Sequence, residues 1–124
     1  MARRILVAED EVLAAMAIED ELLRAGYEVE LAPDGQAALE AARRALPDLL
    51  LTDLRMPRLD GVALIRGVRA LSPHLPVVVM TGYAPLGSTD SFRRDGEGPV
   101  AVFAKPLDMD AVLAALHGLL PPED

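Results

Sequence analysis

The stretch Leu49-Leu50-Leu51-Thr52-Asp53-Leu54-Arg55-Met56-Pro57 decides the fold of this chain. Three leucines and a threonine form the apolar run typical of a buried strand, and Asp53 ends that run. A carboxylate at the carboxyl end of a buried strand lies at the mouth of an α/β sheet, where ligands bind. Asp53 is therefore either a turn residue or a reactive group, and the rest of the chain must decide between the two.

Strand and helix patterns alternate along the whole sequence. Four further apolar runs predict strands, and with the central run they cover Arg3–Ala8, Tyr27–Leu31, Asp48–Thr52, Pro76–Met80 and Val100–Ala104. Apolar residues at helical spacing predict the helices, which run from about Glu11 to Ala25, from Asp34 to Pro47, from Asp60 onward and from about Asp108 to Leu119. The alternation predicts an α/β fold with a doubly wound, five-stranded parallel sheet, covered by helices on both faces.

Each predicted helix has one apolar face, and one inter-strand segment lacks such a face. In the first helix the apolar face consists of Ala15, Ile18, Leu22 and Ala25, with Val12, Met16 and Leu23 beside them. In the second helix it consists of Ala38, Leu39, Ala42 and Leu46. The third helix is expected to point Leu64, Ile65, Val68 and Leu71 inward. Between Thr81 and Pro99 the sequence has two prolines and four glycines with little apolar periodicity. This composition predicts a short or irregular fourth helix, because glycine and proline both disfavour helix interiors.

Composition narrows the class of protein. The chain has 124 residues, a net charge of −8 and no cysteine, and its pI is near 4.7. The length predicts one domain spanning residues 1–124, with no output domain after the last helix. The negative charge argues against nucleic-acid and anionic-membrane partners. With no membrane span or signal peptide in the pattern, we expect a cytoplasmic protein.

Acidic residues follow two strands that the fold makes neighbours. In a sheet of order 2-1-3-4-5, the first and third strands flank the point where strand order reverses, and ligands bind beyond their carboxyl ends. Glu9 and Asp10 leave the first strand and Asp53 leaves the third. Three carboxylates in one crevice repel each other unless a cation joins them, and oxygen ligands with room for water suit Mg²⁺. The sequence therefore predicts a magnesium site at this edge.

Two more polar residues complete the constellation. Thr81 ends the fourth strand, and Lys105 ends the fifth as the only lysine among 12 basic residues. A phosphoryl group placed on Asp53 would meet a metal ion, an ammonium and a hydroxyl, which is the equipment of phosphoryl transfer. Each residue also has a simpler interpretation as a helix cap, a turn former or a solvated cation. Those interpretations would have to hold independently at four strand ends.

These residues resemble the receiver domain of two-component response regulators over essentially the whole chain. The matching stretches are Ile-Leu-Val-Ala-Glu9-Asp10-Glu11, Leu-Leu-Thr-Asp53-Leu-Arg-Met56-Pro57-Arg-Leu-Asp60-Gly61, Val-Val-Met-Thr81-Gly-Tyr and Ala-Lys105-Pro106. The resemblance implies a flavodoxin-like fold of the receiver type and a phosphoprotein with an aspartyl phosphate. It also implies that the phosphoryl donor is a sensor histidine kinase or a histidine phosphotransfer protein, with an unknown protein downstream.

The resemblance also implies a role for each site residue. Asp53 is the phosphoacceptor, and Asp53, Asp10, Glu9 (through water) and the backbone carbonyl of Arg55 bind Mg²⁺. Thr81 hydrogen-bonds the phosphoryl group and Lys105 pairs with it. A cis peptide bond between Lys105 and Pro106 is expected, since receivers of this kind use it to aim the lysine inward. The chain is expected to be no enzyme beyond its own phosphorylation and dephosphorylation.

The sequence departs from the family in the residues that transmit the signal. The family's usual switch aromatic, three residues before the lysine, is replaced by Val102. Tyr83 and Phe103 are the candidates for the missing ring. Since Val102 cannot act as a rotating aromatic, we expect phosphorylation to draw Thr81 toward the new oxygens and to order residues 83–99.

Three other functions fit the sequence less well. A flavin-mononucleotide carrier needs a hydroxyl- and glycine-rich loop after the first strand, and Glu9-Asp10-Glu11 would repel phosphate there. An aspartate-nucleophile phosphatase needs a second aspartate where this chain has Arg55. A receiver-like docking module that is never phosphorylated would normally have lost Asp53, Lys105 or the acidic pair.

Overall fold

The computed structural model describes residues 3–56, 58–82 and 98–121. In chain order its elements are β1 (Arg4–Ala8), α1 (Val12–Arg24), β2 (Glu28–Ala32), α2 (Gly35–Arg44), β3 (Leu49–Asp53), α3 (Gly61–Leu71), β4 (Val77–Thr81), β5 (Val100–Ala104) and α5 (Met109–Leu119). The segment predicted to hold the fourth helix runs from residue 83 to residue 99, and its residues 83–97 lie outside the described residues. Among the described helices, none has the length and hydropathy needed to cross a membrane.

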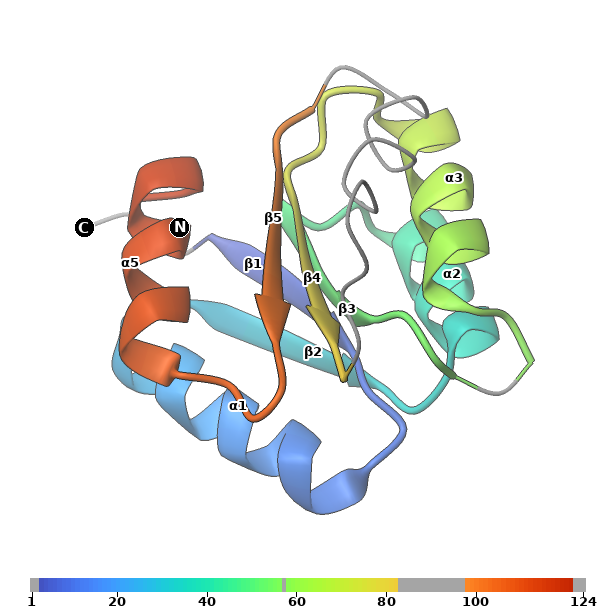
Figure 1. Cartoon of the computed structure of the whole chain (residues 1–124). Coiled ribbons are helices and arrows are strands. Elements are labelled where there is room, and N and C mark those ends of the chain that lie inside the picture. The colour runs from blue at the N-terminus through green and yellow to red at the C-terminus, as the bar shows by residue number, and fades with distance from the viewer. Residues whose placement is uncertain (1–2, 57, 83–97, 122–124) are drawn as a thin grey trace.

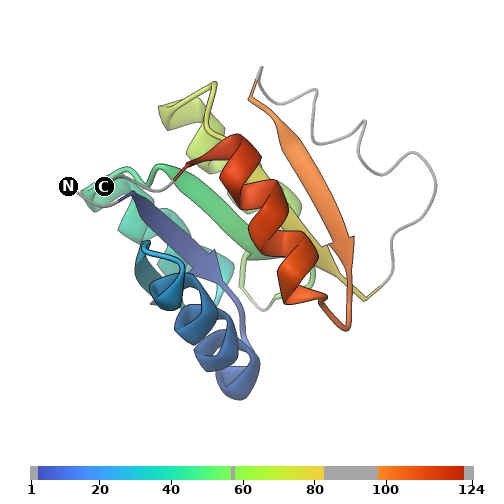
Figure 2. The same cartoon turned by 90° about the vertical axis from the view of Figure 1, so that its left-hand side faces the viewer.

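The sheet confirms the predicted strand order. Its five strands run in the order β2-β1-β3-β4-β5, and every pairing is parallel. Helices α1 and α5 cover one face of the sheet, while α2 and α3 cover the other (Figure 1). The view turned by 90° shows α1 and α5 lying in front of the sheet (Figure 2). The parallel strands therefore all end at one edge of the sheet.

Two aliphatic clusters form the core, one on each face of the sheet. Alternation along β1 sends Leu6 to the side of α2 and α3 and Val7 to the side of α1 and α5. Strand β3 divides its side chains in the same way, with Leu50 and Leu51 on opposite faces, and all of its residues are buried. Fully burying a Leu or Val side chain contributes about 1.5–3 kcal/mol each, so these clusters hold the strand ends rigidly in place.

The predicted helix starts are confirmed where side chains cap them. The Asp34 carboxylate accepts from the Ala37 N–H at 2.8 Å, and the Asp60 carboxylate accepts from the Ala63 N–H at 2.9 Å. Each bond satisfies one amide that the helix leaves without an internal acceptor. Gly26, just past α1, has φ 98°, the left-handed conformation that favours glycine.

Some apolar faces differ from the prediction. Leu71 was expected inward, but it is 43% exposed. Arg69, two residues earlier on α3, is only 1% exposed, and its guanidinium donates to the carbonyls of Leu75 and Gly98. The arginine reaches backbone acceptors at the amino ends of β4 and β5, which is why a charged residue occupies the inner face. Helix α2 also ends at Arg44, before Leu46, which is half exposed.

Helix α1 has a narrower buried face than the sequence pattern suggested. Ala15, Ile18 and Leu22 are buried as expected. The apolar residues flanking that stripe point outward, and the strongly exposed ones are Val12, Leu13, Met16 and Leu23. Helix α1 therefore packs on the sheet through its small central stripe and leaves apolar side chains at the surface along its length.

Candidate functional site

The three predicted carboxylates meet at the carboxyl edge of the sheet. Ala8 pairs with Thr52 in the β1–β3 ladder, so the residues that follow these two strands emerge side by side. One carboxylate oxygen from each of Glu9, Asp10 and Asp53 lies within 4.8 Å of the others. Glu9 and Asp53 are 2% and 7% exposed, whereas Asp10 is exposed. The site is an acidic crevice with one side open to solvent.

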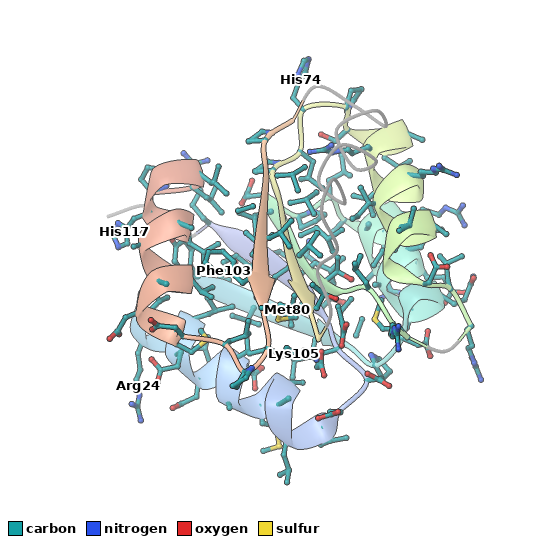
Figure 3. The ribbon with its side chains drawn as sticks, in the orientation of Figure 1. Arg24, His74, Met80, Phe103, Lys105 and His117 are labelled. Atoms are coloured by element: carbon teal, nitrogen blue, oxygen red, sulfur yellow. The ribbon has the colours of Figure 1, made fainter. Side chains whose placement is uncertain are left out.

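Lys105 reaches this crevice from the end of β5. Its Nζ donates to Asp53 Oδ2 at 2.6 Å and to Glu9 Oε2 at 3.2 Å. Its backbone N–H donates to the Thr81 carbonyl at 2.8 Å, which ties the end of β5 to the end of β4. Figure 3 shows Lys105 at the edge of the sheet beside α1, on the side opposite His74. The bond between Lys105 and Pro106 is cis, as predicted.

The ionisation of the crevice follows from burial and from these contacts. Burial raises the pKa of the Glu9 carboxyl; the Lys105 ammonium opposes this and the Asp53 charge adds to it. Burial would lower the pKa of the Lys105 ammonium, but its hydrogen bond to Asp53 and the charges of Asp53 and Glu9 raise it overall. The Glu9 and Asp53 carboxyls thus share one charged ammonium, and the exposed Asp10 carboxyl lies beside them.

The chemistry of this donor set fits Mg²⁺. All three side chains offer oxygen, the ligand that hard divalent cations prefer, and Asp10 leaves one side open for water. The Arg55 backbone lies in the next turn of chain, and its N–H donates to Asp53 Oδ1 at 3.2 Å. The Arg55 side chain is exposed. A hollow of about 500 Å³ adjoins this turn and is lined by Asp10, Leu54, Arg55, Met56, Asp60 and Val62.

The predicted switch residues lie on the two strands beyond Asp53. Met80 pairs with Asp53, so Thr81 stands one residue past it at the end of β4, where it is buried. Val102 packs against the cluster on the side of α2 and α3, and Phe103 packs against the cluster on the other face. A ring at Phe103 would therefore act from the opposite face of the sheet to Val102. Tyr83 lies outside the described residues.

The chain matches a known family at this point. The family model for the response regulator receiver domain covers residues 5–117. This chain is a receiver domain of that family. Among solved structures, the chemotaxis protein CheY4 of Vibrio cholerae has a TM-score of 0.88 and 26% identity, with 97% of this chain and 100% of that chain covered. The receiver domain of a Pseudomonas aeruginosa sensor histidine kinase, with a magnesium ion in its active-site cleft, has a TM-score of 0.82 and 30% identity over 96% of this chain and 98% of that one.

The curated relatives of this receiver domain differ in length. Protein-glutamate methylesterase/protein-glutamine glutaminase 1 of Anaeromyxobacter dehalogenans is 43% identical over 86% of this chain, which spans 30% of that protein. The transcriptional regulatory protein ZraR of Escherichia coli is 35% identical over 94% of the chain, which spans 26% of it. Sporulation initiation phosphotransferase F of Bacillus subtilis is 29% identical, and 98% of this chain covers 96% of that protein.

Sequence reasoning missed two features of the site. It assigned Lys105 to the phosphoryl group alone, whereas the ammonium also binds Glu9. It also passed over Gly35, whose position places α2 against the loop after β3. A glycine directly after an N-capping aspartate is a weak signal for such an approach, because the partner is distant in sequence.

Proposed function

We propose that this receiver domain is a phosphoacceptor in a two-component phosphorelay and that Asp53 receives the phosphoryl group. The observation that carries the proposal is the environment of the Asp53 carboxylate. One oxygen is held by the Lys105 ammonium at 2.6 Å and the other by the Arg55 amide at 3.2 Å. The carboxylate is thereby fixed at the sheet edge with its charge partly balanced, beside two further carboxylates.

The proposed reaction is a direct transfer of the phosphoryl group. An oxygen of Asp53 forms a bond to the phosphorus of a phosphohistidine, the P–N bond breaks, and the imidazole nitrogen keeps the electron pair. Lys105, released from Asp53 Oδ2, pairs with the new phosphoryl oxygens, and the Thr81 hydroxyl donates to them. The protein supplies position and charge, and it performs no chemistry beyond its own phosphorylation and dephosphorylation.

Mg²⁺ completes the proposed site. Asp53, Asp10 and the Arg55 carbonyl would bind the ion directly, and Glu9 would bind it through water. The ion supplies positive charge that offsets the repulsion between the carboxylates and the incoming phosphoryl group. The oxygen-only donor set supports this assignment, as does the magnesium ion in the cleft of the Pseudomonas aeruginosa relative.

The proposed partners follow from the same chemistry. The donor is a phosphohistidine of a sensor histidine kinase or of a phosphotransfer protein in the cytoplasm. Phosphorylation then switches the surface around β4 and β5 through Thr81, Tyr83, Val102 and Phe103, and a downstream protein binds the switched surface. The match to a phosphotransferase along nearly its whole length supports a relay role. The net charge of −8 argues against direct contact of this domain with nucleic acid or an anionic membrane.

Labelling with radioactive acetyl phosphate tests the proposal. Wild-type protein should incorporate label with Mg²⁺ and lose that incorporation when EDTA removes the ion. Asp10→Asn should raise the Mg²⁺ concentration needed for half-maximal labelling by at least the roughly 10- to 100-fold that loss of a partner behind a metal ligand costs. Labelling that proceeds equally well in EDTA would contradict the Mg²⁺ dependence, and no labelling under any condition would contradict the phosphoacceptor role.

A further inference from the structure

We infer that Gly35, the first residue of α2, is a positioning residue for the loop between β3 and α3. This loop joins Asp53 to Asp60 and carries Arg55. The inference rests on the proposed function, because its consequence is measured at the Mg²⁺ site. Gly35 touches none of the reacting groups and acts through the loop backbone.

The contact between Gly35 and the loop is one of backbone against backbone. A Cβ added at Gly35 would lie 1.8 Å from the Leu59 carbonyl oxygen and 2.7 Å from the Leu59 carbonyl carbon. Neither atom can rotate away as a side-chain end could. Any residue with a side chain here must therefore displace the Leu59 backbone or lift the start of α2 from the loop.

A second contact joins the same helix start to the preceding loop residue. Arg58 Nε lies 4.0 Å from Asp34 Oδ2, while the other Asp34 oxygen caps α2. Arg58 has φ 71°, a left-handed conformation that residues other than glycine rarely adopt. The Arg58 side chain is 74% exposed, so the ion pair contributes little. Arg58 thus keeps its left-handed conformation directly beside Leu59, whose backbone packs closely against Gly35.

The opposite end of the loop is equally fixed. The Gly61 N–H donates to the Leu54 carbonyl at 2.9 Å, and a Cβ at Gly61 would meet the Asp53 carbonyl oxygen at 2.4 Å. Helix α3 thus fixes the start of the loop and α2 fixes its far end. Arg55 lies between these two anchors, next to Asp53. We expect a shift at Leu59 to reach the Arg55 backbone, because the loop is short and both of its ends are held.

The variant Gly35→Ala tests the inference against a matched control. Gly67 lies on α3 and faces α2, where a Cβ would meet the Leu39 Cδ1 atom at 2.8 Å, a side-chain end that can move. Gly67→Ala therefore crowds the α2–α3 interface without pressing on the loop. We expect Gly35→Ala to raise the Mg²⁺ half-saturation for acetyl phosphate labelling by about 10- to 100-fold. Gly67→Ala should leave this value within about twofold, since side-chain repacking costs stability instead.

Amide chemical shifts of Arg55 and Met56 without Mg²⁺ give a readout independent of labelling. They should move in Gly35→Ala and stay in place in Gly67→Ala, while urea midpoints report any general loss of stability in both. If Gly35→Ala does not fold, Arg58→Gly is the second variant, because a glycine at this position makes the backbone of the same loop more flexible. It should raise the Mg²⁺ half-saturation by a smaller factor without lowering the urea midpoint.

The outcomes separate the two proposals. Labelled wild type together with unchanged half-saturation and unmoved amides in Gly35→Ala would overturn the positioning role. If Gly35→Ala is unfolded, an unchanged half-saturation in Arg58→Gly would overturn it. Unlabelled wild type would overturn the proposed function, and the Arg55 and Met56 amides would still decide whether Gly35 positions the loop.

Discussion

Replacing Glu9 by glutamine should stabilise the protein in the absence of Mg²⁺ and weaken its response to the ion. The Glu9 carboxylate is almost fully buried, touches the Lys105 ammonium and lies close to the Asp53 carboxylate. Glutamine has nearly the same shape but no charge. The variant therefore tests whether the acidic crevice is strained until a cation enters it.

The size of the effect follows from three opposing contributions. At an effective dielectric constant of about 20, the attraction between Glu9 and Lys105 across 3.2 Å is about 5 kcal/mol. The repulsion between Glu9 and Asp53 across at most 4.8 Å is at least about 3.5 kcal/mol, and the exposed Asp10 adds a screened repulsion. These charge interactions nearly cancel. The desolvation of the buried carboxylate, several kcal/mol for an ion in a protein, is then decisive. Because a buried amide retains part of that cost, we expect a gain of about 1–2 kcal/mol.

Urea unfolding in EDTA at several pH values measures this gain. Burial raises the pKa of folded Glu9 above its ordinary value of 4.5. At pH values between the pKa of Glu9 in the unfolded chain and its raised pKa in the folded protein, the folded protein binds more protons than the unfolded chain. Wild-type stability therefore falls as the pH rises through that window. Glu9→Gln lacks this loss. Its advantage should be greatest at neutral pH and should shrink as the pH falls toward 4.5.

Magnesium should stabilise the wild-type protein more than it stabilises Glu9→Gln. At 100 times its dissociation constant, Mg²⁺ should add about 2.7 kcal/mol to wild-type stability, and Glu9→Gln should gain less at the same concentration. Glu28→Gln, at an exposed glutamate on β2, is the matched control and should show neither effect. A Glu9→Gln variant that is less stable than wild type at neutral pH in EDTA would refute the reasoning.

Two further predictions concern the framework. Tyr27 donates its hydroxyl to the Leu120 carbonyl at 2.6 Å, so Tyr27→Phe should cost about 1–3 kcal/mol in urea unfolding; a loss near zero would contradict this. Burial raises the pKa of Tyr27 above 10, so wild type should lose stability as the pH rises from 10 through that raised value, and the variant should lose less. Arg69→Met should cost about 2–4 kcal/mol, because it strips charged donors from the Leu75 and Gly98 carbonyls. Its Mg²⁺ half-saturation should be unchanged, and a large change there would show that the two ends of the sheet are coupled.

The sequence predicted the sheet and the crevice because both depend on local patterns. Apolar runs mark the strands, and parallel topology brings the residues that follow them to one edge, as Glu9 and Asp53 show. It could not predict contacts that depend on distant backbone. Arg69 lies on the apolar face of α3 because carbonyls from two other segments converge there. The spacing of apolar residues along α3 carries no information about the positions of those carbonyls.

The approach of Gly35 to Leu59 is unreadable from the sequence for the same reason: 24 positions separate them, and only the folded chain joins them. Leu71 shows the complementary error. Its spacing from Leu64 and Val68 places it near the apolar stripe, but α3 ends at Leu71 itself, and the side chain there is left 43% exposed. Periodicity assigns faces well in the middle of a helix and less well in its last turn.

Mapping the phosphoryl group to one residue tests the central claim most directly. Protein treated with acetyl phosphate and Mg²⁺ is digested under conditions that preserve acyl phosphates, and mass spectrometry locates the modified peptide. We expect the modification on Asp53 alone, its complete loss in Asp53→Asn, and full retention in Asp110→Asn, which removes an exposed carboxylate on α5. Undiminished phosphorylation of Asp53→Asn would contradict the account.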